Sequence, residues 1–126
     1  MEFLNAIKAR IPDYAKDVRL NLDGVIARSG LGPQEAVGAA LAAAFAARSP
    51  ELVRAFRGSG ILTEQESSAA LTAASLMGMT NVWYTYVDMA AEADEEIRKV
   101  QAQLRMNAYA SHGGVDQRRF ELWALV

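Results

Sequence analysis

The sequence has no cysteine among its 126 residues and a single histidine. The lack of cysteine excludes a disulfide framework, thiolate zinc sites and thiol catalysis by this chain alone. The histidine, His112, precedes two glycines, so we expect it on a solvent-exposed loop. One histidine cannot form a transition-metal site unless several carboxylates converge on it. Ser111 beside it does not indicate a hydrolase, because the chain has no G-x-S-x-G motif.

An excess of basic charge is also missing: 13 lysines and arginines face 15 aspartates and glutamates, and the formal net charge is -2 at pH 7. An acidic balance gives no general attraction to phosphate backbones or anionic lipid. Arg105, Arg118 and Arg119 are too few for a nucleic-acid footprint. The glycines match neither a P-loop nor a dinucleotide fingerprint, since G-K-[ST] and G-x-G-x-x-G are both missing. We therefore expect no nucleic-acid partner, no bound cofactor and no metal.

Long hydrophobic runs are missing as well. The longest apolar run, in the region of residues 36–47, is too short and too weakly hydrophobic to span a bilayer. The N-terminus carries an acid at position 2 and lacks the apolar core of a signal peptide. These features predict a cytoplasmic protein without a membrane partner.

What the sequence does contain is alanine. Hydrophobic residues make up 52% of the chain, and alanine dominates them. Alanine is the best helix former and allows helices to pack closely. We predict an all-α fold of about six to eight helices without a sheet, and a single domain over residues 1–126.

Helix boundaries can be predicted from apolar spacing, prolines and capping residues. The expected helices cover residues 2–11, 12–28, 33–48, 50–57, 64–76, 82–89, 92–104 and 116–126, with one or two further turns before Gly113 and Gly114. Ser49, Thr63 and Asp116 are expected as N-caps, Thr63 within a capping box closed by Glu66.

Three local features carry further expectations. Gly24 lies inside the second helix, where close packing against a neighbouring element could explain it. Residues 77–81 indicate a break or kink, with Thr80 or Asn81 capping the helix that follows. The helix at residues 92–104 is expected to hold two ion pairs at i,i+4 spacing. They are Asp94–Arg98 and Glu95–Lys99.

Two clusters of side chains invite a functional interpretation. The acids Glu92, Asp94, Glu95 and Glu96 could bind a hard cation, but a solvated face paired with Arg98 and Lys99 is the favoured interpretation. The second cluster could line a ligand pocket, although core packing is favoured because methionine commonly fills gaps. Its members are Met77, Met79, Met89, Trp83, Tyr84 and Tyr86, and Val82 and Val87 lie among them.

The last stretch, VDQRRFELWALV, is expected to form an apolar helix with one carboxylate in its middle, Glu121. A helix that is apolar on all sides is normally buried. Glu121 could be a partly buried carboxylate suited to proton transfer. It could equally form a salt bridge with Arg118, three residues earlier, or with another helix. Both interpretations stay open on the residues alone.

Four strings in this sequence carry a family resemblance: PDYAKDVRLNL (12–22), MGMTNVWY (77–84), LRMNAYA (104–110) and FELWALV (120–126). In order and approximate spacing they resemble the alkyl hydroperoxidase D (AhpD) family of the carboxymuconolactone decarboxylase-like superfamily. The resemblance implies an all-helical fold assembled as a homotrimer and serving bacterial peroxide defence. It further implies a C-x-x-C pair that reduces peroxide or oxidised peroxiredoxin and is re-reduced by a lipoyl group of a 2-oxoacid dehydrogenase component.

By the same resemblance, the glutamate of FELW feeds protons to those cysteines, and it corresponds to Glu121. The family places its C-x-x-C on the same helix, roughly three turns beyond FELW. This sequence ends before that point, so the resemblance covers the N-terminal, non-catalytic portion. His112 matches none of the family's catalytic histidines, because it precedes FELW.

Alternative functions remain. The chain could be a non-catalytic, cysteine-free helical module that oligomerises or binds an apolar ligand. A carboxymuconolactone-type decarboxylase is a third possibility with weaker support from the local strings. If further residues normally pack on Phe120, Trp123 and Val126, the chain is expected to expose an apolar patch.

Overall fold

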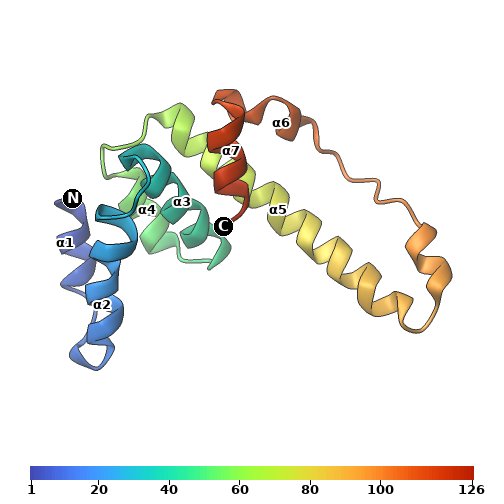
Figure 1. Ribbon diagram of the computed structural model, residues 1–126, viewed down its shortest axis with the longest axis horizontal. Coiled ribbons are helices and arrows are strands. Elements are labelled where there is room, and N and C mark those ends of the chain that lie inside the picture. Colours follow the sequence, from blue (N-terminus) through green and yellow to red (C-terminus); the bar gives the residue numbers. More distant parts are fainter.

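The computed structural model describes residues 1–126 and contains helices but no strand (Figure 1). The α-helices are α1 (Phe3–Lys8), α2 (Lys16–Leu22), α3 (Pro33–Ala46), α4 (Pro50–Arg57), α5 (Glu64–Ala91), α6 (Asn107–Ala110) and α7 (Gln117–Ala124). Short segments of tighter or wider helix are η1 (Asp13–Ala15), η2 (Asp23–Ala27), η3 (Glu95–Lys99) and η4 (His112–Gly114). The predicted all-α class and helix number are confirmed.

The centre of the fold is formed by α3, α5 and α7, which pack against one another, with α4 against α3 (Figure 1). The first half of α5 presents a stripe of small residues to this centre. The stripe consists of Ala69, Ala70, Ala73 and Ala74. Small side chains on α5 leave room for the two largest buried residues, Phe120 and Trp123 of α7. The alanine content thus serves close helix packing, as the composition predicts.

Helix α3 accepts the indole of Trp123 through a glycine. A Cβ atom built at Gly38 would lie 2.2 Å from Cε2 of Trp123, far inside van der Waals contact. The indole Nε1 also donates a hydrogen bond to the carbonyl of Glu35, at 3.1 Å. Gly38 therefore allows α7 to approach α3 closely enough for this bond.

The N-terminal helices attach to the centre through few contacts. The ring of Phe3 meets the ring of Phe56 edge-on at 5.8 Å, and Lys8 donates a 2.8 Å hydrogen bond to Asp23. The bond from Lys8 lowers the pKa of the Asp23 carboxyl, with burial opposing it. The turn Asp23–Ala27 is π-helical. Gly24 lies in it with only an Arg28 nitrogen, 4.0 Å away, near an added Cβ, so the expected close packing there is wrong.

The apolar residues at helical spacing between positions 14 and 26 are only partly buried. Ile26 is buried and Leu22 half-buried, whereas Tyr14, Val18 and Val25 are exposed. No other element covers the outer side of α2. The spacing correctly predicts one face of a helix, but it cannot show how much of that face finds a partner within the chain.

Helix α5 runs without interruption from Glu64 to Ala91, so the break predicted at residues 77–81 is wrong. The Thr80 hydroxyl bonds the carbonyl of Leu76, one turn back, instead of capping a new helix. An added Cβ at Gly78 would meet nothing within 4 Å. The conformational freedom of Gly78 does not break α5, because the residues on both sides of it are helical. The expected helical state of residues 82–89 is confirmed.

The second half of α5 extends away from α3, α4 and α7 (Figure 1). We call this half of the helix the arm, and the packed helices the body. After the arm, the chain returns toward the body through η3 and a non-helical segment. Contacts with η3 cover one side of the arm, where Val87 and Ala91 are buried. The other side carries an exposed apolar stripe of Val82, Tyr86 and Met89.

The charged stretch after α5 departs from the predicted helix at residues 92–104. It forms a short 3-10 helix at Glu95–Lys99, and residues 101–106 form neither helix nor strand. Tighter winding moves neighbours from four to three residues apart. Arg98 therefore pairs with Glu95 at 3.0 Å, and Lys99 with Glu96 at 2.6 Å. The predicted i,i+4 pairs are wrong.

Arg98 makes its strongest contact with the end of α5. It donates a 2.9 Å hydrogen bond to Asp88, and this bond, with a second that Arg98 donates to Glu95, raises the pKa of the guanidinium. The ion pair between Arg98 and Asp88 thus joins η3 to the second half of α5. None of the helices has the length and apolar character needed to cross a membrane.

Candidate functional site

The candidate site is built on α7, whose start is set by local capping. Asp116 accepts a hydrogen bond from the backbone N–H of Arg119 at 3.0 Å, so the predicted N-cap is confirmed. The preceding turn rests directly on α5. Gly113 has φ +59, and a Cβ there would lie 2.7 Å from Cβ of Ala69. Gln65 donates a 2.8 Å bond to the carbonyl of Gly114.

An ion pair joins α7 to the beginning of α5. Nη1 of Arg119 lies 2.6 Å from Oε1 of Glu66, and the Glu66 side chain is only 14% exposed. The other oxygen of Glu66 accepts the N–H of Thr63 at 2.9 Å, which completes the predicted capping box. One carboxylate therefore closes the start of α5 and orients α7.

Two aromatic side chains pack α7 against α3 and α5. Phe120 and Trp123 are fully buried, and Tyr109 meets the Phe120 ring edge-on at 5.5 Å. The ring of His112 lies 5.9 Å from that of Phe120. His112 is half-buried rather than solvent-exposed, so that part of the prediction is wrong. Its φ of 50 places this non-glycine residue in the left-handed region.

Glu121 lies on α7 between the two anchoring aromatics in sequence, and its side chain is half-buried. Nε2 of Gln117, one turn earlier, donates a 2.7 Å hydrogen bond to Oε1 of Glu121. No ion pair joins Glu121 to Arg118 or to another helix, so the predicted salt bridge is wrong. Glu121 thus keeps its second carboxylate oxygen free of protein donors.

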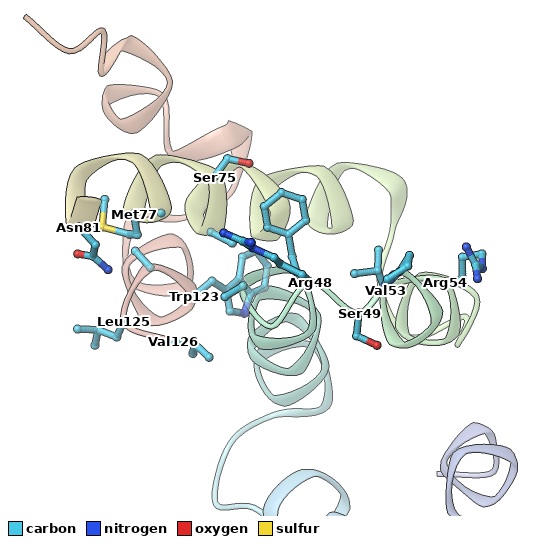
Figure 2. Close-up of a pocket in the computed structure, with 16 residues that line it drawn as sticks. Arg48, Ser49, Val53, Arg54, Ser75, Met77, Asn81, Trp123, Leu125 and Val126 are labelled. Atoms are coloured by element: carbon cyan, nitrogen blue, oxygen red, sulfur yellow. The ribbon is translucent and has the colours of Figure 1, made fainter. Parts of the chain in front are cut away.

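A cleft of about 780 Å³ opens where α7 ends (Figure 2). The end of α3, the start of α4, the middle of α5 and the last residues of α7 line it. Its apolar wall includes Phe45, Val53, Met77, Trp123 and Leu125. Glu121 is not among the lining residues. The sequence-predicted carboxylate and this cleft are therefore separate features.

Sequence reasoning missed Arg48, which lies at the rim of this cleft. Its φ of 57 is left-handed, and the N–H of Ser49 bonds the carbonyl of Ala44 at 3.0 Å, as in a glycine-terminated helix end. A signal was present: α3 had to stop within two residues of Pro50, and so tight a turn commonly needs a left-handed residue.

The other candidate clusters do not form sites. No group of three or more histidine, aspartate or glutamate side chains is arranged to hold a metal ion. The acids after α5 form a solvated face paired with Arg98 and Lys99, as favoured from the sequence. The expected core packing of the methionines and aromatics of residues 77–89 is wrong for Tyr84, Tyr86 and Met89, which are exposed. Met77 lines the cleft.

Comparison with known proteins gives consistent relatives. The chain is 44% identical over 124 residues to the alkyl hydroperoxide reductase AhpD of Rhodospirillum centenum, which covers 97% of this chain and 65% of that protein. It is 42% identical to the AhpD of a Bradyrhizobium species and 40% to that of Brucella canis, covering 67% and 69% of them. No family model matches. The chain spans about two-thirds of the length of these relatives.

Proposed function

The chain belongs to the alkyl hydroperoxide reductase AhpD family, and we propose that it forms the proton-relay portion of a thiol-dependent hydroperoxide reductase. The supporting observation is the 44% identity over 97% of the chain. In this proposal Glu121 relays protons to a C-x-x-C pair, which this cysteine-free chain does not itself contain. The reaction serves antioxidant peroxide defence and the regeneration of peroxiredoxin.

The geometry of α7 supports a role for Glu121 in proton transfer. Phe120 and Trp123 fix the rotation of the helix, because both are fully buried. Gln117 holds one carboxylate oxygen of Glu121, and the other has no protein donor. A half-buried carboxylate in a fixed orientation can exchange a proton with a neighbouring group, which is the basis of general acid–base catalysis.

A coupled assay tests the thiol requirement. The purified 126-residue chain is incubated with cumene hydroperoxide, dihydrolipoamide and a lipoamide reductase that reports on NADH. We expect only the background rate, since the chain supplies no thiolate. The proposal would be wrong if the chain alone gave thiol-dependent turnover.

The coding sequence beyond codon 126 tests the place of the thiols. We expect a C-x-x-C within roughly three helical turns. In the protein extended to include it, Glu121→Gln should lower the peroxidase rate by about 10²-fold or more, the usual size of a general acid–base contribution. Glu92→Gln is the matched control, because Glu92 is an exposed glutamate after α5. Equal rates for the two variants would exclude the relay.

A second candidate function is a non-catalytic module that assembles with copies of itself. The observation that favours it is the exposed stripe of Val82, Tyr86 and Met89 on the arm, since large exposed apolar patches commonly mark interaction surfaces. By family resemblance the assembly would be a homotrimer. A lipoylated 2-oxoacid dehydrogenase component and a peroxiredoxin would be its partners.

Multi-angle light scattering tests the assembly. The wild-type chain is expected to give a trimer mass, and Tyr86→Glu should shift it toward the monomer by placing a charge in the stripe. Ser68→Glu is the control, because Ser68 is an exposed position on the body half of the same helix. A wild-type chain that stays monomeric at high concentration, without binding an apolar dye, would contradict the assembly.

A further inference from the structure

Three helices at the N-terminal end of the fold border an apolar groove of about 800 Å³. Helices α1, α2 and α4 each contribute two apolar residues at i, i+4 spacing to its lining. They are Phe3 and Ile7, Val18 and Leu22, and Leu52 and Phe56. All lining residues lie between positions 3 and 58, so the groove is formed without α7 or the residues that follow it. We call it the N-terminal groove.

The N-terminal groove carries an unpaired positive charge. Two arginines and one glutamate line it. Arg10 pairs with Glu51, whereas Arg54 is exposed and takes part in none of the ion pairs. The surrounding sequence has the same sign, because residues 1–58 hold eight basic and six acidic side chains. An apolar partner bordered by acids therefore fits this groove better than one bordered by bases.

The exposed stripe of the arm has the complementary properties. Val82, Tyr86 and Met89 are 72%, 59% and 69% exposed, and their i, i+4, i+7 spacing is that of a helix whose apolar face fills a groove. Residues 82–99 hold five acidic and two basic side chains. Of these acids, Glu92 and Asp94 form no ion pair. The arm is thus an apolar helix face bordered by unpaired negative charge.

The two surfaces lie at opposite ends of the molecule. Figure 1 shows α1 and α2 at one end and the tip of the arm at the other, with the body between them. An arm therefore cannot reach the groove of its own chain, but it can reach the groove of a second copy. A contact between two different surfaces is head-to-tail, and such contacts form a ring when the rotation between copies closes.

We propose that the arm of one copy of this chain docks its stripe of Val82, Tyr86 and Met89 in the N-terminal groove of a second copy, with the acids of the arm facing Arg54. The inference rests on the second candidate function, self-assembly, and deepens it by naming the two surfaces that meet. A stripe that paired with the same stripe of another copy would instead leave the groove unused.

Light scattering of single variants tests the groove. Val18→Glu places a charge in the groove and should keep the fold, because Val18 is 59% exposed. It should abolish the trimer, as Tyr86→Glu does. Val25→Glu is the matched control, since Val25 is 70% exposed and does not line the groove. A Val18→Glu trimer would overturn the proposal while self-assembly stands, whereas a monomeric wild type would refute both.

Mixing the two variants tests the head-to-tail arrangement. The arm is intact in a Val18→Glu chain and the groove is intact in a Tyr86→Glu chain, so a mixture holds one matching pair of surfaces. It should form a 1:1 dimer, although each variant alone is a monomer. A mixture that stays monomeric would overturn the proposal, because a head-to-tail contact must be restored by combining two different defects.

A charge reversal tests the facing of Arg54 and the arm. Arg54→Glu should weaken the assembly at least about tenfold at low salt, because it brings like charges together. Arg118→Glu is the matched control, since Arg118 is exposed, forms no ion pair and lies outside the groove. Equal weakening by the two variants would show that net charge governs the assembly, and would contradict the proposed contact.

The protein extended through the coding sequence beyond codon 126 separates a second copy from further residues of the same chain. Val18→Glu should abolish the trimer of the extended protein as well. A trimer that survives this substitution would show that the groove is filled within its own chain or that other surfaces join the copies. Either result would overturn the proposal.

Discussion

Two glycines in helix interiors should respond to the same substitution with opposite signs. Gly38 in α3 and Gly78 in α5 are both helical. Alanine is favoured over glycine in a helix interior by about 1 kcal/mol. Gly78→Ala should gain this amount, because nothing lies within 4 Å of the added Cβ.

At Gly38 the same gain is outweighed by a collision. The added Cβ would lie 2.2, 2.3 and 2.4 Å from three atoms of the Trp123 indole, which is fully buried and cannot rotate away. Overpacking of a core costs about 1–3 kcal/mol. Displacing the indole also breaks its bond to the Glu35 carbonyl, which costs about 1 kcal/mol. Net of the helix gain, we expect Gly38→Ala to destabilise by about 1–3 kcal/mol.

Urea denaturation followed by far-ultraviolet circular dichroism measures both variants. The difference in unfolding free energy between Gly38→Ala and Gly78→Ala should be about 2–4 kcal/mol. A Gly38→Ala protein as stable as the wild type would show that α7 does not pack on α3 as described.

A double-mutant cycle isolates the collision. The three atoms nearest the added Cβ are Cε2, Nε1 and Cζ2 of Trp123, and phenylalanine lacks that part of the indole. In a Trp123→Phe background, Gly38→Ala should therefore be neutral or stabilising. Additive effects of the two substitutions would mean that Gly38 and Trp123 do not interact.

Three further predictions concern side chains that fix the ends of helices. Arg48→Gly should raise the unfolding free energy in urea by about 1 kcal/mol, because glycine adopts the left-handed conformation of this position without the steric cost of a Cβ atom. A loss of stability would show that the backbone at Arg48 is not strained. Asp23 has a pKa lowered from 3.8 by its bond from Lys8, so its stabilisation is complete above pH 3.8 and lost as pH falls through the lower folded value. Asp23→Asn should therefore destabilise the protein at neutral pH but not at the lowest pH, and a pH-independent difference would contradict the linkage. Glu66→Gln, which leaves the guanidinium of Arg119 without its counter-charge, should cost about 1–2 kcal/mol in thermal or urea unfolding. Adding Arg119→Met should recover part of that loss, and strictly additive losses would argue against the pair.

Much of the local structure could be predicted from the sequence because it depends on neighbours along the chain. Asp116 caps α7 and Thr63 caps α5, as expected. The helical state of residues 82–89 and the all-α class follow from residue types and spacing. These interactions close within one helical turn, so short stretches of sequence contain them.

What could not be predicted depends on contacts between distant segments. The uninterrupted α5 contains Gly78, which in isolation indicates a break. Close packing between helices requires glycine at position 38 and not at position 24. Gly38 faces the indole of Trp123, which lies 85 positions later in the chain. The place of Arg48 at the rim of the cleft likewise depends on α5 and α7 meeting the end of α3. No periodicity in one helix specifies which residue of another it will meet.

In the candidate site, too, part of the arrangement could be predicted from the sequence and part could not. Glu121 could be singled out from the sequence, since a lone acid in an apolar helix is visible there. Its partner could not, because both Arg118 and Gln117 are within reach at i−3 and i−4. The structure selects Gln117, and a neutral donor leaves the carboxylate without the charge compensation that a salt bridge would provide.

The anchoring of α7 has a consequence for the proposed relay. Phe120 and Trp123 flank Glu121 in sequence and are both fully buried, so the body of the fold, and not any thiol, sets the direction of its carboxylate. Gly38 lets the Trp123 indole pack against α3, and Glu66 pairs with Arg119, two residues before Glu121. A substitution that loosens either contact should therefore weaken proton delivery without touching a reacting group. In the protein extended to include its thiols, Gly38→Ala measured below its unfolding temperature should lower the peroxidase rate in the same direction as Glu121→Gln but by less. It should add little to Glu121→Gln in the double variant, because the carboxylate that the packing orients is then already lost. Full additivity would mean that the seating of α7 and the relay act independently.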